Sequence, residues 1–141
     1  MSKKHDRRTR IMLDYVKSNF NMKYMSITAD LEGYENCKVE RAYLDNNLEP
    51  LERYPDLRAI DEFSEVNVHI IGEAKTESDY IERNLDAEIQ MDVYINVLKT
   101  KMSPFLIYSV PSSIYSKVYN DIKRKLNIFN ANNVTFKVLY K

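Results

Sequence analysis

The sequence predicts one mixed α/β domain, of the α+β kind, in which a central mixed β-sheet is flanked by helices. Short apolar runs rich in β-branched residues alternate along the chain with longer segments whose apolar residues recur at helical spacing. The chain has 141 residues, a length that suits one domain with a real core. Hydrophobic residues make up 44%, as is usual for a globular protein. We therefore expect residues 1–141 to form a single domain, with residues 1–5 as a flexible basic tail.

The first third of the chain predicts a helix followed by weaker strands. Met12, Tyr15, Val16 and Phe20 fall near one face of a helix. The segment over residues 45–53 is polar, which favours a loop. In order, the expected elements are a helix over residues 6–20, strands over residues 25–28 and 37–43, and a loop over residues 45–53.

A β-hairpin is predicted next. Pro55 opens its first strand, over residues 56–60, where a proline removes no hydrogen bond from the sheet. The polar turn Asp61–Glu65 leads into a second strand, Val66–Lys75, which is rich in β-branched residues. The two strands should therefore pair antiparallel.

The second half alternates helices with strands. A long helix is expected over residues 78–100, with Ser78 or Asp79 as its N-terminal cap. The continuous apolar run over residues 105–110 predicts a buried strand. A second helix, over residues 113–126, carries its apolar residues at near-ideal helical spacing, and a final strand over residues 134–140 follows an asparagine-rich break.

Composition excludes several classes of protein. Lysine plus arginine number 21 and aspartate plus glutamate number 21, so no global field attracts nucleic acid and any such binding must come from local patches. Cys37 is the one cysteine, which excludes an intrachain disulfide or a cysteine-based zinc site. No apolar run reaches the ~18 residues of a membrane span, and no secretory signal segment is visible. We expect an intracellular, cytoplasmic protein with no membrane partner.

Three ionisable side chains converge at the open end of the predicted hairpin. Side chains alternate along a strand, so Glu73 and Lys75 lie on one face, about 7 Å apart. With the turn centred near Ser64 and Glu65, Asp56 lies opposite Glu73 and points to the same face. A slip of one residue would move Asp56 to the other face, so the prediction depends on this register.

Two acids and a lysine at such spacing indicate phosphodiester chemistry. The two carboxylates repel each other unless a cation neutralises them. Magnesium prefers carboxylate oxygen and keeps waters that a phosphate can replace. A bound metal acts as a Lewis acid and lowers the pKa of its water, and a neighbouring lysine can activate that water or steady charge on the phosphate. This pattern favours hydrolysis of a phosphodiester bond.

The arrangement resembles the PD-(D/E)XK nuclease superfamily, which has the restriction-endonuclease-like fold. Pro55-Asp56 matches the PD element, and Glu73-Ala74-Lys75 matches (D/E)XK. The family's core order, helix–strand–strand–strand–helix–strand, is similar to the order expected here, with an extra C-terminal helix and strand. The resemblance rests on residues 55–94.

The helix after the motif strengthens the resemblance. Ala87, Gln90, Met91, Tyr94 and Leu98 share one helical stripe. A glutamine on a stripe that faces the core needs hydrogen-bond partners, which a metal-bound water or a phosphate would supply. Gln90 and Tyr94 reproduce the Gln-x-x-x-Tyr pattern of the RecB-type branch, which implies that they position substrate or lysine.

The resemblance implies a metal-dependent deoxyribonuclease. Asp56 and Glu73 would hold Mg²⁺, with Mn²⁺ as a substitute and the backbone carbonyl of Ala74 as a further ligand. Lys75 would activate water. Many family members carry a further acid on the first helix, a role that Asp14 could take here, although a solvated surface position for Asp14 is an equally good interpretation. DNA is the expected polymer, and a homodimer or a subunit of a larger complex is the expected assembly.

Basic residues outside the motif are candidate nucleic-acid contacts. One cluster lies near the N-terminus and one on the helix over residues 113–126. Arg58 lies two residues after Asp56 on the same strand face, where it could reach a phosphate near the metal. The candidates are Arg58, Arg7, Arg8, Arg10, Lys117, Lys123 and Arg124.

Simpler interpretations of the same residues stay open. Asp56 could cap a turn, and Glu73 with Lys75 could form an exposed cross-strand pair. Gln90 could be a surface residue and Tyr94 a core residue. His69 is expected to be structural and His5 to lie in the disordered tail, so a histidine-rich metal site is not expected. The rival function is a catalytically inactive binding or assembly protein of the same fold within a nucleic-acid-processing complex.

Overall fold

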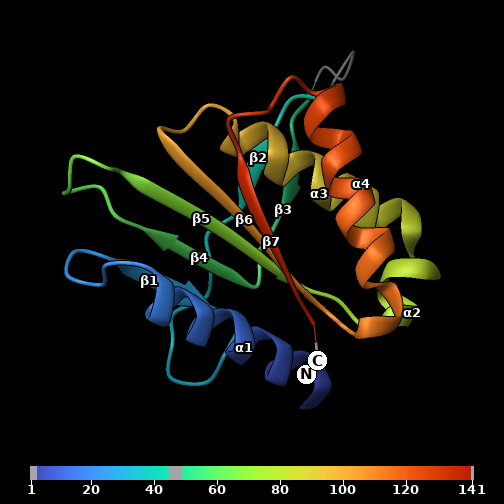
Figure 1. Cartoon of the computed structure of the whole chain (residues 1–141), viewed down its shortest axis with the longest axis horizontal. Helices are drawn as coiled ribbons and strands as arrows, with labels where there is room; N and C mark the ends of the chain where they lie inside the picture. The colour runs from blue at the N-terminus through green and yellow to red at the C-terminus, as the bar shows by residue number, and fades with distance from the viewer. Residues whose placement is uncertain (1–2, 45–48, 141) are drawn as a thin grey trace.

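A computed structural model describes residues 3–44 and 49–140 of the chain as a mixed β-sheet with helices on both faces (Figure 1). The mixed α/β class and the flanked mixed sheet are therefore confirmed. The elements are α1 (Lys3–Asn19), β1 (Ser26–Ala29), β2 (Glu40–Ala42), β3 (Leu51–Arg53), β4 (Leu57–Ile60), β5 (Val68–Ala74), α2 (Glu77–Ile81), α3 (Asn84–Leu98), β6 (Ser103–Val110), the 3₁₀ turn η1 (Ser112–Ile114), α4 (Tyr115–Ile128) and β7 (Thr135–Tyr140).

The five-stranded sheet has the order β1-β4-β5-β6-β7. β1, β4 and β5 pair antiparallel, whereas β5, β6 and β7 run parallel, because helices connect them. In the β4–β5 hairpin Leu57 faces Gly72 and Ile60 faces His69, which is the predicted register. The hairpin prediction is thus confirmed, and the next position along places Asp56 at the level of Glu73.

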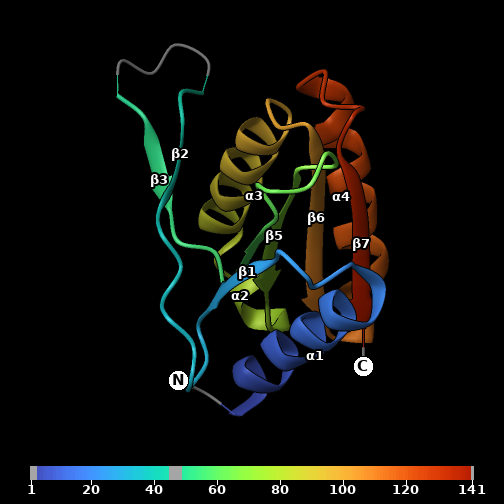
Figure 2. The same cartoon turned by 90° about the vertical axis from the view of Figure 1, so that its left-hand side faces the viewer.

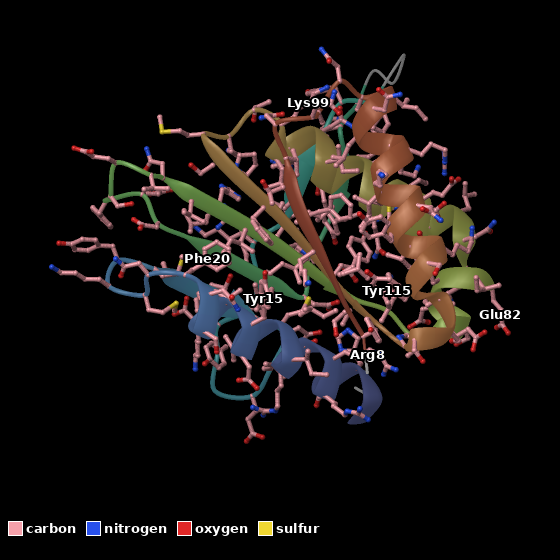
Figure 3. All side chains as sticks on the ribbon, viewed as in Figure 1. Arg8, Tyr15, Phe20, Glu82, Lys99 and Tyr115 are labelled. Carbon is pink, nitrogen blue, oxygen red and sulfur yellow. The ribbon has the colours of Figure 1, made fainter. Side chains whose placement is uncertain are left out.

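Helix α1 covers one face of the sheet. Its buried residues Met12 and Val16 pack with the inward side chains of β4, β5 and β6. Tyr15 and Phe20 face Phe105 of β6, with ring centroids 6.4 Å and 5.1 Å apart (Figure 3). Gly72 lets α1 approach closely, because a Cβ there would lie 3.0 Å from the Met12 sulfur.

The other face carries α3 and α4, and a two-stranded ribbon lies outside α3. β2 and β3 pair antiparallel as a separate sheet, and α3 lies between this ribbon and the main sheet (Figure 2). Ala42 and Leu44 turn inward and join the core built around α3. Because α3 is covered on two sides, its buried residues extend beyond the predicted stripe to Val93 and Ile95.

Three sequence-based expectations about the elements are wrong. The expected loop over residues 45–53 contains β3, whose outward residues are polar while Leu51 turns inward; residues 45–48 lie outside the described ranges. The expected helix over residues 78–100 is two helices, because Arg83 leaves the helical conformation, and Thr76 rather than Ser78 or Asp79 caps the first of them. Residues 3–5 are helical rather than a flexible tail.

Among the helices within residues 3–44 and 49–140, none has both the length and the apolar character that crossing a bilayer requires.

Candidate metal centre

The backbone fixes Asp56 at the end of the hairpin. Its N–H donates to the Gly72 carbonyl at 3.0 Å, and its own carbonyl accepts from the Asp30 N–H at 2.8 Å. Its side-chain Oδ2 accepts from the Ala74 N–H at 2.8 Å. Asp56 therefore ties β1, β4 and β5 together at one point, and its carboxylate is buried. The Ala74 N–H is engaged in this way, while the role expected of the Ala74 carbonyl stays a prediction.

Glu73 lies beside Asp56 with two further partners. The Tyr94 hydroxyl of α3 donates to Glu73 Oε1 at 2.8 Å, and Lys75 Nζ lies 3.5 Å from Glu73 Oε2. All four side chains are buried. The hairpin and α3 thus bring together Asp56, Glu73, Lys75 and Tyr94, four of the five residues predicted to be catalytic.

The environment pushes the pKa values of the two acids apart. Burial and the neighbouring Asp56 charge raise the pKa of Glu73 well above its ordinary value, although Lys75 and Tyr94 oppose this. Burial also raises the pKa of Asp56, but hydrogen bonds from His5, Glu73 and Ala74 outweigh it, and the net pKa of Asp56 is lowered. Two close carboxyl groups that share a site in this way favour one charge between them unless a cation is added.

A second cluster meets Asp56 from its other side. His5 Nε2 lies 3.0 Å from Asp56 Oδ1. The ligand atoms of His5, Asp30 and Asp56 all lie within 4.8 Å of one another, the one such group of three among the described residues. A hydrogen bond with Asp56 raises the pKa of His5 despite its partial burial. The expectation that His5 lies in a disordered tail is therefore wrong.

The sequence contained signals for both missed residues. His5 continues the buried stripe of α1 towards the N-terminus, through Thr9, Met12 and Val16, at helical spacing. Asp30 comes directly after β1, at the edge of the sheet where Asp56 also lies. Neither signal by itself predicts a metal ligand. The two residues become candidate ligands because the fold places α1 and the end of β1 beside Asp56.

The donor set suits a divalent cation. Carboxylate oxygens are the ligands that magnesium and manganese prefer, and an imidazole nitrogen favours the transition metal of the two. Gln90, one turn before Tyr94 on α3, has a buried side-chain oxygen with no hydrogen-bond partner among the described residues. A pocket of about 320 Å³ is lined by Asp30, Asp56 and Tyr54, so this side of the centre is open to a ligand.

The basic candidates divide between the two faces of the sheet. Arg7, Arg8 and Arg10 follow His5 on α1, and Arg8 lies at the N-terminal end of that helix (Figure 3). Lys117, Lys123 and Arg124 lie on α4, across the sheet (Figure 1). There Lys117 and Arg124 pair with Asp121, and Lys123 lies over the Tyr119 ring. The first cluster therefore shares α1 with the candidate ligand His5, whereas the second lies on the other side of the sheet.

Arg58 does not point freely towards a phosphate. Its Nε donates to Glu40 Oε1 of β2 at 3.1 Å, so it links the ribbon to the main sheet. His69 lies on the same side, with Nε2 4.0 Å from Glu40 Oε2. Burial, Lys101 and Arg58 lower the pKa of His69 to about 4, so it is neutral at pH 7.

Cys37 is a buried free thiol that donates to the Thr28 carbonyl, and burial raises its pKa to about 11. A thiol with so high a pKa is a poor nucleophile.

No protein-family model, no curated protein and no solved structure matches this chain.

Proposed function

We propose that this protein is a metal-dependent nuclease that hydrolyses phosphodiester bonds, with DNA as its substrate. The observation that carries the proposal is the position of Asp56, whose carboxylate joins the Glu73–Lys75–Tyr94 cluster to the His5–Asp30 cluster. Two clusters that share one carboxylate, with a lysine beside them, would suit a cation and an attacking water. The resemblance of Pro55-Asp56 and Glu73-Ala74-Lys75 to the PD-(D/E)XK motif supports the same chemistry.

His5, Asp30 and Asp56 would hold the cation, with Glu73 as a further ligand. The cation would supply a Lewis acid and a bound water of lowered pKa. Magnesium fits the carboxylates, while the His5 imidazole favours manganese, so we expect Mn²⁺ to support at least as much activity as Mg²⁺.

The protein's own side chains would orient the reaction. Tyr94 holds one oxygen of Glu73 and Lys75 lies near the other, so the Glu73 carboxyl group has a defined orientation. Lys75 would orient or deprotonate the attacking water and steady negative charge on the phosphate. The unpartnered oxygen of Gln90 would accept a hydrogen bond from water or substrate in the site.

Cleavage of a substrate panel tests the proposal. Linear duplex, single strand, branched junction and RNA are each incubated with Mg²⁺, Mn²⁺ or chelator. We expect metal-dependent cleavage, lowered by about 10²-fold or more in Lys75→Ala and Glu73→Gln. The matched controls are Lys137→Ala on β7 and Glu65→Gln in the hairpin turn, because both residues are exposed and lie outside the site.

Cleavage that survives the chelator, or full activity in both site variants, would contradict the mechanism. Metal binding without cleavage of any substrate would instead support the binding or assembly protein.

A further inference from the structure

The outer face of the β2–β3 ribbon presents two exposed tyrosines. Arg41 pairs with Glu52 across the ribbon. Tyr43 and Tyr54 each come directly after a strand of the ribbon, and if the alternation of side chains continues to them they lie on the same outer face as this pair. The exposed fractions of Tyr43 and Tyr54 are 69% and 68%. Ala42, the neighbour of Tyr43 on the inner face of the ribbon, is buried. Single exposed aromatic rings are normal on a protein surface, but two rings on one face can form part of a binding surface.

The inner face of the ribbon is anchored, so the tyrosines stand on a fixed support. Leu44 and Leu51 pack into the core around α3. Arg53 forms an ion pair with Asp86 of α3 at 3.0 Å, and Glu40 accepts from Arg58 of β4. These contacts fix the ribbon against α3 and β4, and Figure 2 shows the ribbon alongside α3.

Tyr54 connects this face to the metal centre. It directly precedes Pro55-Asp56 and lines the same pocket of about 320 Å³ as Asp30 and Asp56. Tyr43 lies roughly 13 Å further along the ribbon, at about 3.3 Å per residue. The aromatic surface thus begins at the candidate metal ligands and leads away from them.

The charge of this face indicates how a strand would be held. Arg41 and Glu52 form an ion pair at 2.7 Å and cancel each other. With no net charge between the rings, phosphate attraction is weak and stacking of bases on the rings is the main available contact. Every base offers a π-face for such stacking once it is unpaired, and stacking on tyrosine tolerates any sequence. In a duplex the faces are covered by neighbouring bases.

We propose that the outer face of the ribbon binds a single-stranded segment of nucleic acid, with Tyr54 stacked on a base beside the candidate metal centre and Tyr43 on a base further along. The proposal rests on the proposed nuclease function and adds its substrate class, a single strand or the unpaired end of a duplex. Tyr54 is then a positioning residue, because it sets which phosphate lies at the metal ligands.

Binding without cleavage tests the proposal. The Lys75→Ala protein is titrated, with chelator present, into a fluorescent 12-nucleotide single strand and into a blunt duplex, and fluorescence anisotropy gives Kd. Adding Tyr54→Ala should weaken single-strand binding roughly 5- to 100-fold, while Tyr54→Phe, which keeps the ring, should bind as before. Duplex binding should be weak and unchanged. Tyr24→Ala is the matched control, since Tyr24 is exposed but lies outside the pocket.

An abasic scan of the strand separates stacking from other effects. At one position, removing the base should weaken binding to the protein with Tyr54 and have no effect on the Tyr54→Ala protein. Unchanged affinity in both Tyr54→Ala and Tyr43→Ala would overturn the proposal. It would also be overturned if these variants alter the sedimentation mass but not the affinity, since the face then contacts a second copy of the chain. Absence of cleavage with intact, Tyr54-dependent binding would remove the nuclease function and leave the strand-binding face standing.

Discussion

At the scale of single residues, the site depends on how each buried polar atom is satisfied. Asp56 has partners on α1, on β5 and directly after β1, and Glu73 has partners on α3 and directly after β5. By contrast, the hydroxyl of Tyr108, also fully buried, has no hydrogen-bond partner among the described residues. Removing a hydroxyl that has a partner, that of Tyr94, can therefore be compared with removing one that has none, that of Tyr108.

Removing the Tyr94 hydroxyl should destabilise the protein. Tyr94→Phe leaves Glu73 Oε1 buried without its donor, which costs about 1–3 kcal/mol. The matched control is Tyr108→Phe, which removes a buried hydroxyl that has no partner and should be neutral or stabilising. Urea unfolding of the metal-free proteins gives both free energies. Equal values for the two variants would contradict the Glu73–Tyr94 contact.

His69 should make stability fall between pH 6.5 and about 4. Its pKa is lowered to about 4 in the folded protein, so the unfolded chain binds the extra proton in this range and stability rises with pH. The His69 shift contributes at most about 3 kcal/mol to the change in the free energy of unfolding over this pH range. Glu40, Arg58 and Lys101 face the ring, and the raised pKa of Glu40 acts in the opposite sense.

The difference between wild type and His69→Gln isolates the histidine contribution from that of Glu40. Urea unfolding at several pH values should show a shallower loss of stability in His69→Gln between pH 6.5 and 4. Parallel stability profiles would show that the ring is not the titrating group.

At the scale of elements, α1 has two roles. Met12 packs on the bare backbone of Gly72, and seven residues earlier the same face of the helix presents His5 to Asp56. The distance between α1 and β5 therefore sets the position of a candidate metal ligand. α3 similarly contributes both core residues and Tyr94, since it lies between the sheet and the ribbon.

Adding a methyl group at Gly72 should push α1 outward. In Gly72→Ala the new Cβ meets Met12 at 3.0 Å and Leu57 at 3.3 Å, which should cost about 1–3 kcal/mol. Met12→Ala alone should cost about 2–5 kcal/mol by leaving a cavity. The double variant should lose less than the sum, because the methyl group enters that cavity. Additive losses in urea unfolding would show that the two sites do not touch.

At the scale of the whole molecule, metal binding should stabilise the fold. The donors come from α1, from the residue after β1 and from the residue before β4, which meet in the native state and separate on unfolding. At a metal concentration 100 times Kd the gain is about 2.7 kcal/mol, a rise in Tm of roughly 5–10 °C for a chain of this size.

The comparison of two histidine variants tests this prediction. His5→Ala should abolish most of the Mn²⁺-induced rise in Tm, because His5 is a candidate ligand. His69→Gln should keep the rise and is a matched control, because it also removes one imidazole but lies beside Glu40 instead. Thermal denaturation with and without Mn²⁺ measures the rise. An undiminished rise in His5→Ala would place the ion elsewhere.

Much of the hairpin could be predicted because its determinants are local. Proline at the strand entry, a polar turn and two-residue alternation specify the register that pairs Leu57 with Gly72. The same alternation places Lys75 near Glu73, and helical spacing places Tyr94 on the buried face of α3. The strand expected over residues 37–43 contains β2, but its partner β3 was missed, because β3 is three residues long and its inward Leu51 carries little signal.

The sequence by itself determined the mixed α/β class, the hairpin register and the grouping of Glu73 with Lys75, because each follows from periodicity within an element or across one tight turn. The tertiary structure alone decided that His5 and Asp30 meet Asp56. That meeting requires α1 to pack over Gly72 and β1 to lie beside β4. These contacts join residues far apart in the chain, and periodicity says which face of an element is buried but not which element covers it.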